Sequence, residues 1–161
     1  MEYIIKDKID ELIAKGIMEY GNNELDAETR EAIRIKLELH RAIKNELTKA
    51  EKKNGKEITP EEELNILLGM KTQREESWTI YKNAGRWDLA NKENMEAEML
   101  SHILPALPTD EDIEMYTKGI IELHYNGKCE MRNMKDILAE VKKKYPSAEG
   151  KLVSSVVKQY V

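Results

Sequence analysis

Apolar residues of this chain recur every three to four positions along almost its whole length. That spacing is the period of an α-helix with one buried face, whereas a half-buried strand alternates apolar and polar residues. No segment shows convincing strand alternation. We therefore expect an all-α protein, with an N-terminal four-helix lobe followed by a small C-terminal three-helix bundle.

Turn and capping residues place the ends of the first two helices. The first is expected over residues 2–20, because Gly21-Asn22-Asn23 tolerate the positive φ with which helices commonly end. Asp26 can cap the second helix, since a short carboxylate accepts the free amide hydrogens of a first turn. That helix is expected to run to about residue 53, ahead of Asn54-Gly55.

The third and fourth helices are expected to meet at a glycine corner. Thr59-Pro60-Glu61-Glu62 combines a capping threonine, a first-turn proline and a glutamate three residues after the cap. The helix that it opens continues to about Asn83. Ala84-Gly85 then turns the chain, and Asp88 is the expected cap of the fourth helix.

Two prolines mark a boundary in the second half of the chain. Pro105 and Pro108 bracket a short, stiff connection, so we expect an N-terminal lobe of residues 1–105 and a C-terminal lobe of residues 109–161. Three short helices with apolar faces follow, which is enough for a small bundle, over about 109–125, 133–144 and 149–160.

Charged residues occupy apolar stripe positions on the third and fourth helices. Lys71 and Arg74 lie on the stripe of the third helix, and Glu93 and Glu96 take the corresponding positions on the fourth. A partly buried charge is costly unless it is paired and hydrogen-bonded. If the two helices pack antiparallel, we expect interhelical ion pairs that fix their register.

Arg86 and Trp87 lie at the corner between these helices. The Arg86 guanidinium is expected to bind the end of the third helix or the acids of the fourth. The expected structural ion-pair network therefore consists of Lys71, Arg74, Arg86, Asp88, Glu93 and Glu96. Trp87 is either a core anchor or an interface residue, and a buried anchor is the default for so large an aromatic side chain.

The net charge of −5 is unevenly distributed. Residues 133–161 contain six lysines and three acidic residues, so this segment carries +3 and the remainder −8. Lysines attract phosphates, and tyrosines such as Tyr145 and Tyr160 can stack on unpaired bases. We therefore expect this segment to contact RNA through five lysines: Lys142, Lys143, Lys144, Lys151 and Lys158. The alternative is a solvated lysine-rich face, and in Lys142–Lys144 a positive charge that favours a helix C-terminus.

The histidines, acids and cysteine of the sequence lack the spacing of a metal site or of an activated nucleophile. Glu93 and Glu96 are one turn apart, but a di-iron bundle needs Glu-x-x-His, a spacing absent from His40, His102 and His124. Cys129 lies in a loop with the positive neighbours Lys128 and Arg132, yet it has no adjacent base. We expect no catalytic residue, no metal and no cofactor.

One cysteine excludes an intramolecular disulfide and fits a reducing compartment. No apolar run approaches the roughly 20 residues that span a bilayer, and the first residues lack the basic lead and apolar core of a signal peptide. A cytoplasmic protein without a membrane partner is therefore expected.

A long motif in the middle of the chain resembles the YqeY-like proteins. It reads Lys71-x-x-Arg74, then Ala84-Gly85-Arg86-x-Asp88-Leu89-Ala90-x-Lys92-Glu93-x-x-Glu96, and closes on Leu104-Pro105. Ala42-Ile43-Lys44-Asn45-Glu46 and Ala148-Glu149-Gly150-Lys151-x-Val153-Ser154 resemble two further family motifs. The chain departs from the family where a basic residue, a Met-Gly pair and an arginine are usual, at Leu37, Met134-Lys135 and Ser147.

YqeY-like proteins share a domain with the tail of the B subunit (GatB) of the tRNA-dependent amidotransferases. The resemblance implies a non-catalytic accessory module that binds tRNA or another structured RNA through its basic end and meets a protein of translation through its acidic lobe. It also implies an association with carbon–nitrogen ligation that uses glutamine as amide donor, chemistry that lies outside the shared tail. If Lys135 and Ser147 contact a partner, that contact is altered here. The alternative is a helical protein-interaction adaptor with no RNA role.

Overall fold

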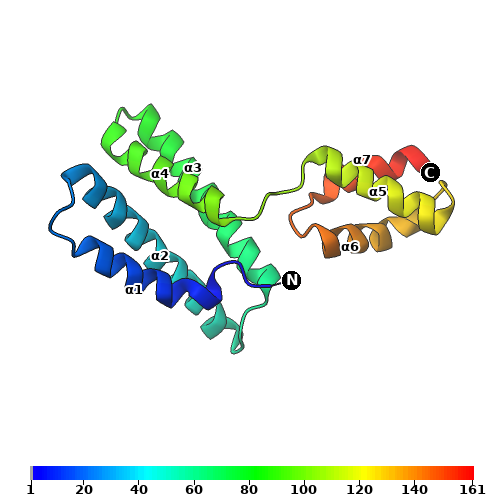
Figure 1. Cartoon of the computed structure of the whole chain (residues 1–161). Coiled ribbons are helices and arrows are strands. Elements are labelled where there is room, and N and C mark those ends of the chain that lie inside the picture. The colour runs from blue at the N-terminus through cyan, green and yellow to red at the C-terminus, as the bar shows by residue number, and fades with distance from the viewer. Residues whose placement is uncertain (1) are drawn as a thin grey trace. The chain divides into compact units, whose positions relative to one another are not determined.

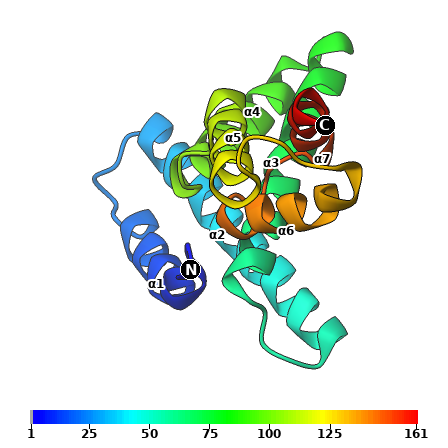
Figure 2. The ribbon, with the colours of Figure 1, turned by 90° about the vertical axis from the view of Figure 1, so that its right-hand side faces the viewer.

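The structure is a computed structural model that describes residues 2–161. These residues form seven α-helices and three short 3-10 helices and contain no β-strand, which confirms the expected all-α class (Figures 1 and 2). The chain divides into two compact units, Met1–Pro105 and Ala106–Val161. Each unit has its own apolar core.

The first unit consists of two helical hairpins, as Figure 1 shows. In one hairpin α1 packs along α2, in the other α3 packs along α4, and α2 also contacts α3 and α4. Fully buried apolar side chains between them are Leu39, Ile43, Ile58, Leu67 and Leu100. The helices, preceded by the 3-10 helix Lys6–Lys8, are α1 (Ile9–Tyr20), α2 (Ala27–Asn54), α3 (Pro60–Asn83) and α4 (Trp87–Ile103).

Two of the expected caps are confirmed. The Asp26 carboxylate accepts the backbone N–H of Thr29 at 2.6 Å and starts α2. Thr59 and Glu62 form a reciprocal capping box at the start of α3, in which each side chain accepts the other residue's backbone N–H. Gly55 closes α2 with a φ of 66°, in the left-handed region that favours glycine.

The expectation that Asp88 caps the fourth helix is wrong. Gly85, at φ 70°, turns the chain so tightly that α4 already begins at Trp87, with Arg86 as its N-cap. Asp88 therefore lies within the first turn, where a negative charge still suits the helix dipole.

The expectation that Trp87 is a buried anchor is also wrong, because its side chain is 54% exposed. As the first residue of α4, it lies at the tip of the corner rather than between the two helices.

The second unit contains α5 (Asp110–Tyr125), α6 (Met134–Lys144) and α7 (Gly150–Val157), with 3-10 helices at Met131–Asn133 and Lys158–Tyr160. The single last helix expected over 149–160 is thus an α-helix that tightens into a 3-10 turn. α5 packs most extensively on α7, and α6 contacts both. The most deeply buried apolar side chains are Ile121, Ile137, Val141, Val153, Val156 and Val157.

Across residues 2–161, no helix is both long and apolar enough to cross a membrane.

Candidate functional site

The α3–α4 hairpin brings Arg74 against Glu93 and Glu96. Arg74 Nε donates a hydrogen bond to Oε2 of Glu96 at 2.5 Å, and Oε2 of Glu93 lies 3.7 Å from the same nitrogen. The side chains of Arg74 and Glu96 are only 19% and 8% exposed. This is a charge-assisted, largely buried hydrogen bond between two helices, of the kind that fixes their relative register.

Lys71 was expected in this contact and does not join it, whereas Arg86 binds an acid of α4, as one of its two expectations had it, but at a separate place. Lys71 Nζ lies 3.5 Å from Oε1 of Glu75 on its own helix, and Arg86 pairs with Asp88 at 3.3 Å on the exposed corner. In an antiparallel hairpin, residues equally far from the corner lie level with each other. Arg74 is level with Glu96, whereas Lys71 is level with Met99, about one turn beyond Glu96 and nearly two beyond Glu93.

Glu93 is the member of the group whose charge is least stabilised. Its Oε2 is buried and has no hydrogen-bond partner within residues 2–161. Burial raises the pKa of the Glu93 carboxyl, and the neighbouring Glu96 charge acts in the same direction, against the opposing influence of Arg74 and Lys92. Two carboxyls therefore compete for one guanidinium, and Glu96 takes its hydrogen bond.

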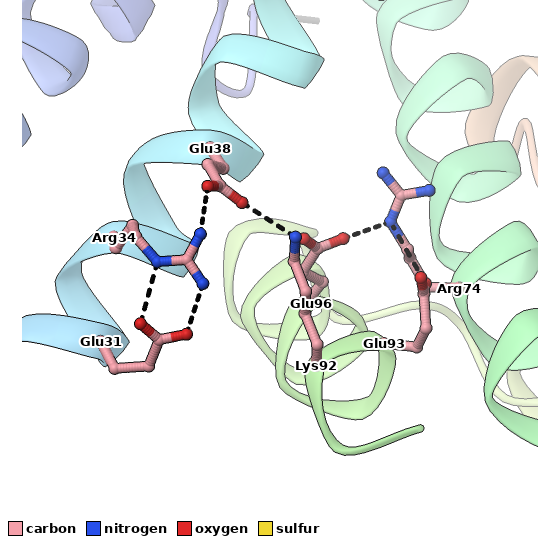
Figure 3. A network of polar contacts seen from close by, with 7 residues as sticks. All are labelled: Glu31, Arg34, Glu38, Arg74, Lys92, Glu93 and Glu96. Carbon is pink, nitrogen blue, oxygen red and sulfur yellow. Dashed lines mark hydrogen bonds and ion pairs between the residues drawn. The ribbon is translucent and has the colours of Figure 1, made fainter. Parts of the chain in front are cut away.

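Sequence reasoning missed the part of this group that lies on α2. Lys92 Nζ, on α4, donates to Oε2 of Glu38 at 2.9 Å, and Arg34 Nη1 donates to the other oxygen of Glu38 at 2.6 Å. Figure 3 shows these charges running from α2 to α4 and on to Arg74 of α3. We call this group the charge network: Glu31, Arg34, Glu38, Lys92, Glu96, Arg74 and Glu93.

The two halves of the charge network act on each other electrostatically. The hydrogen bond from Lys92 lowers the pKa of Glu38. The same bond raises the pKa of Lys92, and the charge of Glu96 contributes in that direction. Lys92 belongs to the motif that carries the family resemblance, and Arg34 and Glu38 have the four-residue spacing of a helical ion pair, so both were visible as signals.

A second missed residue is Glu63, in the first turn of α3. Its side chain is fully buried, and its carboxylate accepts the backbone N–H groups of Ile4 at 2.5 Å, Ile5 at 3.0 Å and Lys6 at 2.7 Å. One carboxylate thus satisfies three amides at the start of the chain and ties that segment to α3. Local spacing points to Glu62, the capping-box residue, and nothing in the local sequence points to Glu63.

The five lysines singled out in the sequence are all exposed and belong to the second unit. None of them lies within 4.0 Å of a carboxylate among the described residues. Three form the last turn of α6 and one follows the N-terminus of α7, so these four lie at the same end of the unit. We call the group the lysine surface: Lys142, Lys143, Lys144, Lys151 and Lys158.

Two tyrosines hold one member of the lysine surface. Lys144 Nζ lies 4.1 Å from the ring centroid of Tyr116 and 5.3 Å from that of Tyr145. The two rings meet edge to face with centroids 5.5 Å apart. Tyr145, which the sequence offered for base stacking, therefore packs against its own unit and a lysine.

Cys129 is part of the second core. It is 3% exposed, its backbone N–H donates to the carbonyl of Tyr160 at 3.0 Å, and its Sγ lies 3.7 Å from the carbonyl oxygen of Val157. These contacts hold the loop before α6 against the C-terminal turn. Among residues 2–161, no three His, Cys, Asp or Glu side chains are grouped closely enough to hold a metal ion.

Comparison with known proteins adds one finding about the whole chain. A search of curated proteins finds none that matches it. The model of a family described as Yqey-like protein matches residues 22–161. The match begins just after α1 and covers both the charge network and the lysine surface. This chain therefore belongs to the YqeY-like family.

Proposed function

We propose that this protein is a non-catalytic accessory module that binds RNA, and tRNA in the first instance, through its lysine surface. The observation that supports this best is a group of five exposed lysines on α6, α7 and the 3-10 turn that follows α7, none with an acidic partner in residues 2–161. The charge network, by contrast, pairs its basic groups with acids.

Unpaired lysines are suited to phosphates for a simple electrostatic reason. Each ammonium group that approaches a phosphate releases a condensed counterion, so affinity depends on salt and hardly on base sequence. Lys151 and Lys158 are seven residues apart, which is about 10 Å along a helix. The lysine surface can therefore contact more than one phosphate of a strand.

Family membership supports tRNA as the RNA, since YqeY-like proteins share a domain with the tail of the amidotransferase B subunit. On this proposal the protein works in the cytoplasm beside glutamine-dependent carbon–nitrogen ligation without performing it. The first unit, which carries most of the negative charge, meets a protein partner of translation.

A filter-binding titration of bulk tRNA, at about 50 and 200 mM salt, tests the proposal. The triple variant Lys142→Glu, Lys143→Glu, Lys144→Glu is expected to bind at least about tenfold more weakly at the lower salt. Its control is the triple variant Lys52→Glu, Lys53→Glu, Lys56→Glu, which reverses three exposed lysines around the end of α2. The control is expected to bind like the native chain. Undetectable binding by the native chain at the lower salt, or equal losses in both variants, would refute the proposal.

An adaptor without an RNA role is the second candidate, and the exposed corner of the first unit favours it. Trp87 is 54% exposed and Ile80 is 65% exposed, and large aromatic side chains often anchor protein interfaces. A protein that co-purifies from the native host after nuclease treatment, and is lost with Trp87→Ala, would support the adaptor.

A further inference from the structure

A cavity of about 400 Å³ opens between α2 and α3 of the first unit, whereas the lysine surface belongs to the second unit. Three carboxamides line it: Asn45 from α2, and Asn65 and Gln73 from α3. The structure gives none of these three side chains a hydrogen-bond partner within residues 2–161. All three residues are exposed, so their donors and acceptors are open to water and to a ligand.

Gly69 lies midway between the two carboxamides of α3. Asn65, Gly69 and Gln73 follow one another at four-residue intervals, so they share one face of the helix. A Cβ atom added at Gly69 would meet nothing within 4 Å beyond its two chain neighbours and the nearby backbone of its own helix. Glycine inside a helix is destabilising relative to alanine, and here no internal packing explains it. Its effect is to leave the backbone of α3 open between the two carboxamides, a gap that we call the slot.

The charges beside the cavity cancel in pairs. Lys49 Nζ lies 2.7 Å from Oε1 of Glu46, and Arg74 is neutralised by Glu96. The Nη groups of Arg74 point away from Glu96, as Figure 3 shows. A polar but neutral lining favours an uncharged hydrogen-bonding ligand over a free phosphate. Partly buried Ile66 adds apolar surface that a flat ring can contact, and Met70 of the core lies behind it.

We propose that this cavity binds an unpaired adenine base. A carboxamide matches adenine because it can donate to N7 and accept from the N6 amino group at the same time. The missing side chain at Gly69 lets the ring approach the helix, and the apolar side chains contact its face. The inference extends the proposed RNA contact to the first unit and gives it a base preference that the lysine surface lacks.

The test is a titration of the full, ¹⁵N-labelled chain with adenosine, followed in ¹H–¹⁵N spectra through the side-chain NH₂ signals of Asn45, Asn65 and Gln73. Because adenosine has no phosphate, the result does not depend on the lysine surface. We expect these signals to shift with a dissociation constant on the order of 1 mM, and uridine to bind more weakly. Shifts that uridine or a capped glycine amide produces as strongly as adenosine would overturn the inference, as would no shift at all.

Two variants test the role of the slot. Gly69→Leu fills it with a good helix former and is expected to weaken adenosine binding at least about tenfold. Gly119→Leu, the same change at a helical glycine of α5 with open space around it, is the matched control and should bind normally. Gln73→Glu removes an amide donor and should reduce the preference for adenosine over uridine.

Unchanged adenosine binding in Gly69→Leu would overturn the inference. A chain that binds tRNA but not adenosine would refute only the cavity, whereas one that binds adenosine but not RNA would refute only the proposed function.

Discussion

Replacing Glu93 and Glu96 by glutamine is expected to change stability in opposite directions. Both acids lie within 4.0 Å of Arg74 Nε, but only Glu96 accepts its hydrogen bond. Glu93 keeps a buried oxygen without a partner within the described chain. Glu93→Gln therefore removes a poorly compensated charge, whereas Glu96→Gln weakens the bond between α3 and α4.

The expected sizes follow from the burial of the two groups. A hydrogen bond to a charged group contributes about 1.5–3 kcal/mol, so Glu96→Gln should lower the free energy of unfolding by about 2 kcal/mol. A buried polar atom without a partner costs about 1–3 kcal/mol. Glu93 is 21% exposed and also attracts Arg74, so we expect Glu93→Gln to raise the free energy of unfolding by about 1 kcal/mol.

The pH dependence of the free energy of unfolding tests the direction of the Glu93→Gln effect independently. Because the pKa of Glu93 is raised in the folded protein above its ordinary value of 4.5, the folded state binds the proton more tightly than the unfolded state. Its contribution to stability is present below about pH 4.5 and is lost as the pH rises through the folded pKa. The gain in free energy of unfolding of Glu93→Gln over the native chain should therefore grow as the pH rises from about 4.5 to 7.

Urea unfolding followed by tryptophan fluorescence measures these changes. Both tryptophans of the chain, Trp78 and Trp87, belong to the first unit, so the signal is free of any separate unfolding of the second. If Glu93→Gln destabilises the unit as much as Glu96→Gln does, Glu93 is a full partner of Arg74 and the reasoning from burial is refuted.

Three further predictions concern the first unit and use the same assay. Burial lowers the pKa of His40, which is 4% exposed and whose buried Nδ1 has no partner in residues 2–161. Its contribution to stability is therefore present above about pH 6.5 and is lost as the pH falls. His40→Leu should flatten the pH dependence of the free energy of unfolding below about pH 6.5, and an unchanged slope would contradict this. Glu63→Ala leaves three backbone amides without their acceptor and should lower the free energy of unfolding by about 3 kcal/mol. Glu63→Gln keeps an acceptor oxygen and should lose less. A loss below about 1 kcal/mol in Glu63→Ala would count against the role of Glu63 as acceptor of these amides. Lys92→Met breaks a half-exposed ion pair with Glu38 and should change the free energy of unfolding by less than about 1 kcal/mol. Added salt should make this change smaller still. A larger loss of stability would mean that the pair is shielded from solvent.

Much of the fold could be predicted because its signals are local. Apolar periodicity gave the helical class, and the Asp26 and Thr59 caps act within a single turn. The Arg74–Glu96 contact could also be expected, because charges on two facing stripes need each other. The start of α4 was misplaced because Gly85 shifts it relative to Asp88.

The remaining features depend on how distant segments meet. Lys71 is only one helical turn from Arg74, but the position of the corner decides which residue of α4 lies beside Lys71. Glu38 meets Lys92 across two helices, and Glu63 meets a segment almost sixty residues earlier. Lys92 and Glu38 each carry a local signal, but nothing local shows that they meet each other, or that Glu63 meets the start of the described chain.

The salt dependence of tRNA binding tests the central claim most directly. If all five residues of the lysine surface contact phosphates, log K should fall with log salt with a slope of about −3.5 to −4.5. Reversing Lys142, Lys143 and Lys144 should make that slope shallower by about 2–3, while the Lys52, Lys53 and Lys56 control keeps the native value. A native slope near zero, or an identical slope in the two triple variants, would contradict an RNA-binding role for the lysine surface.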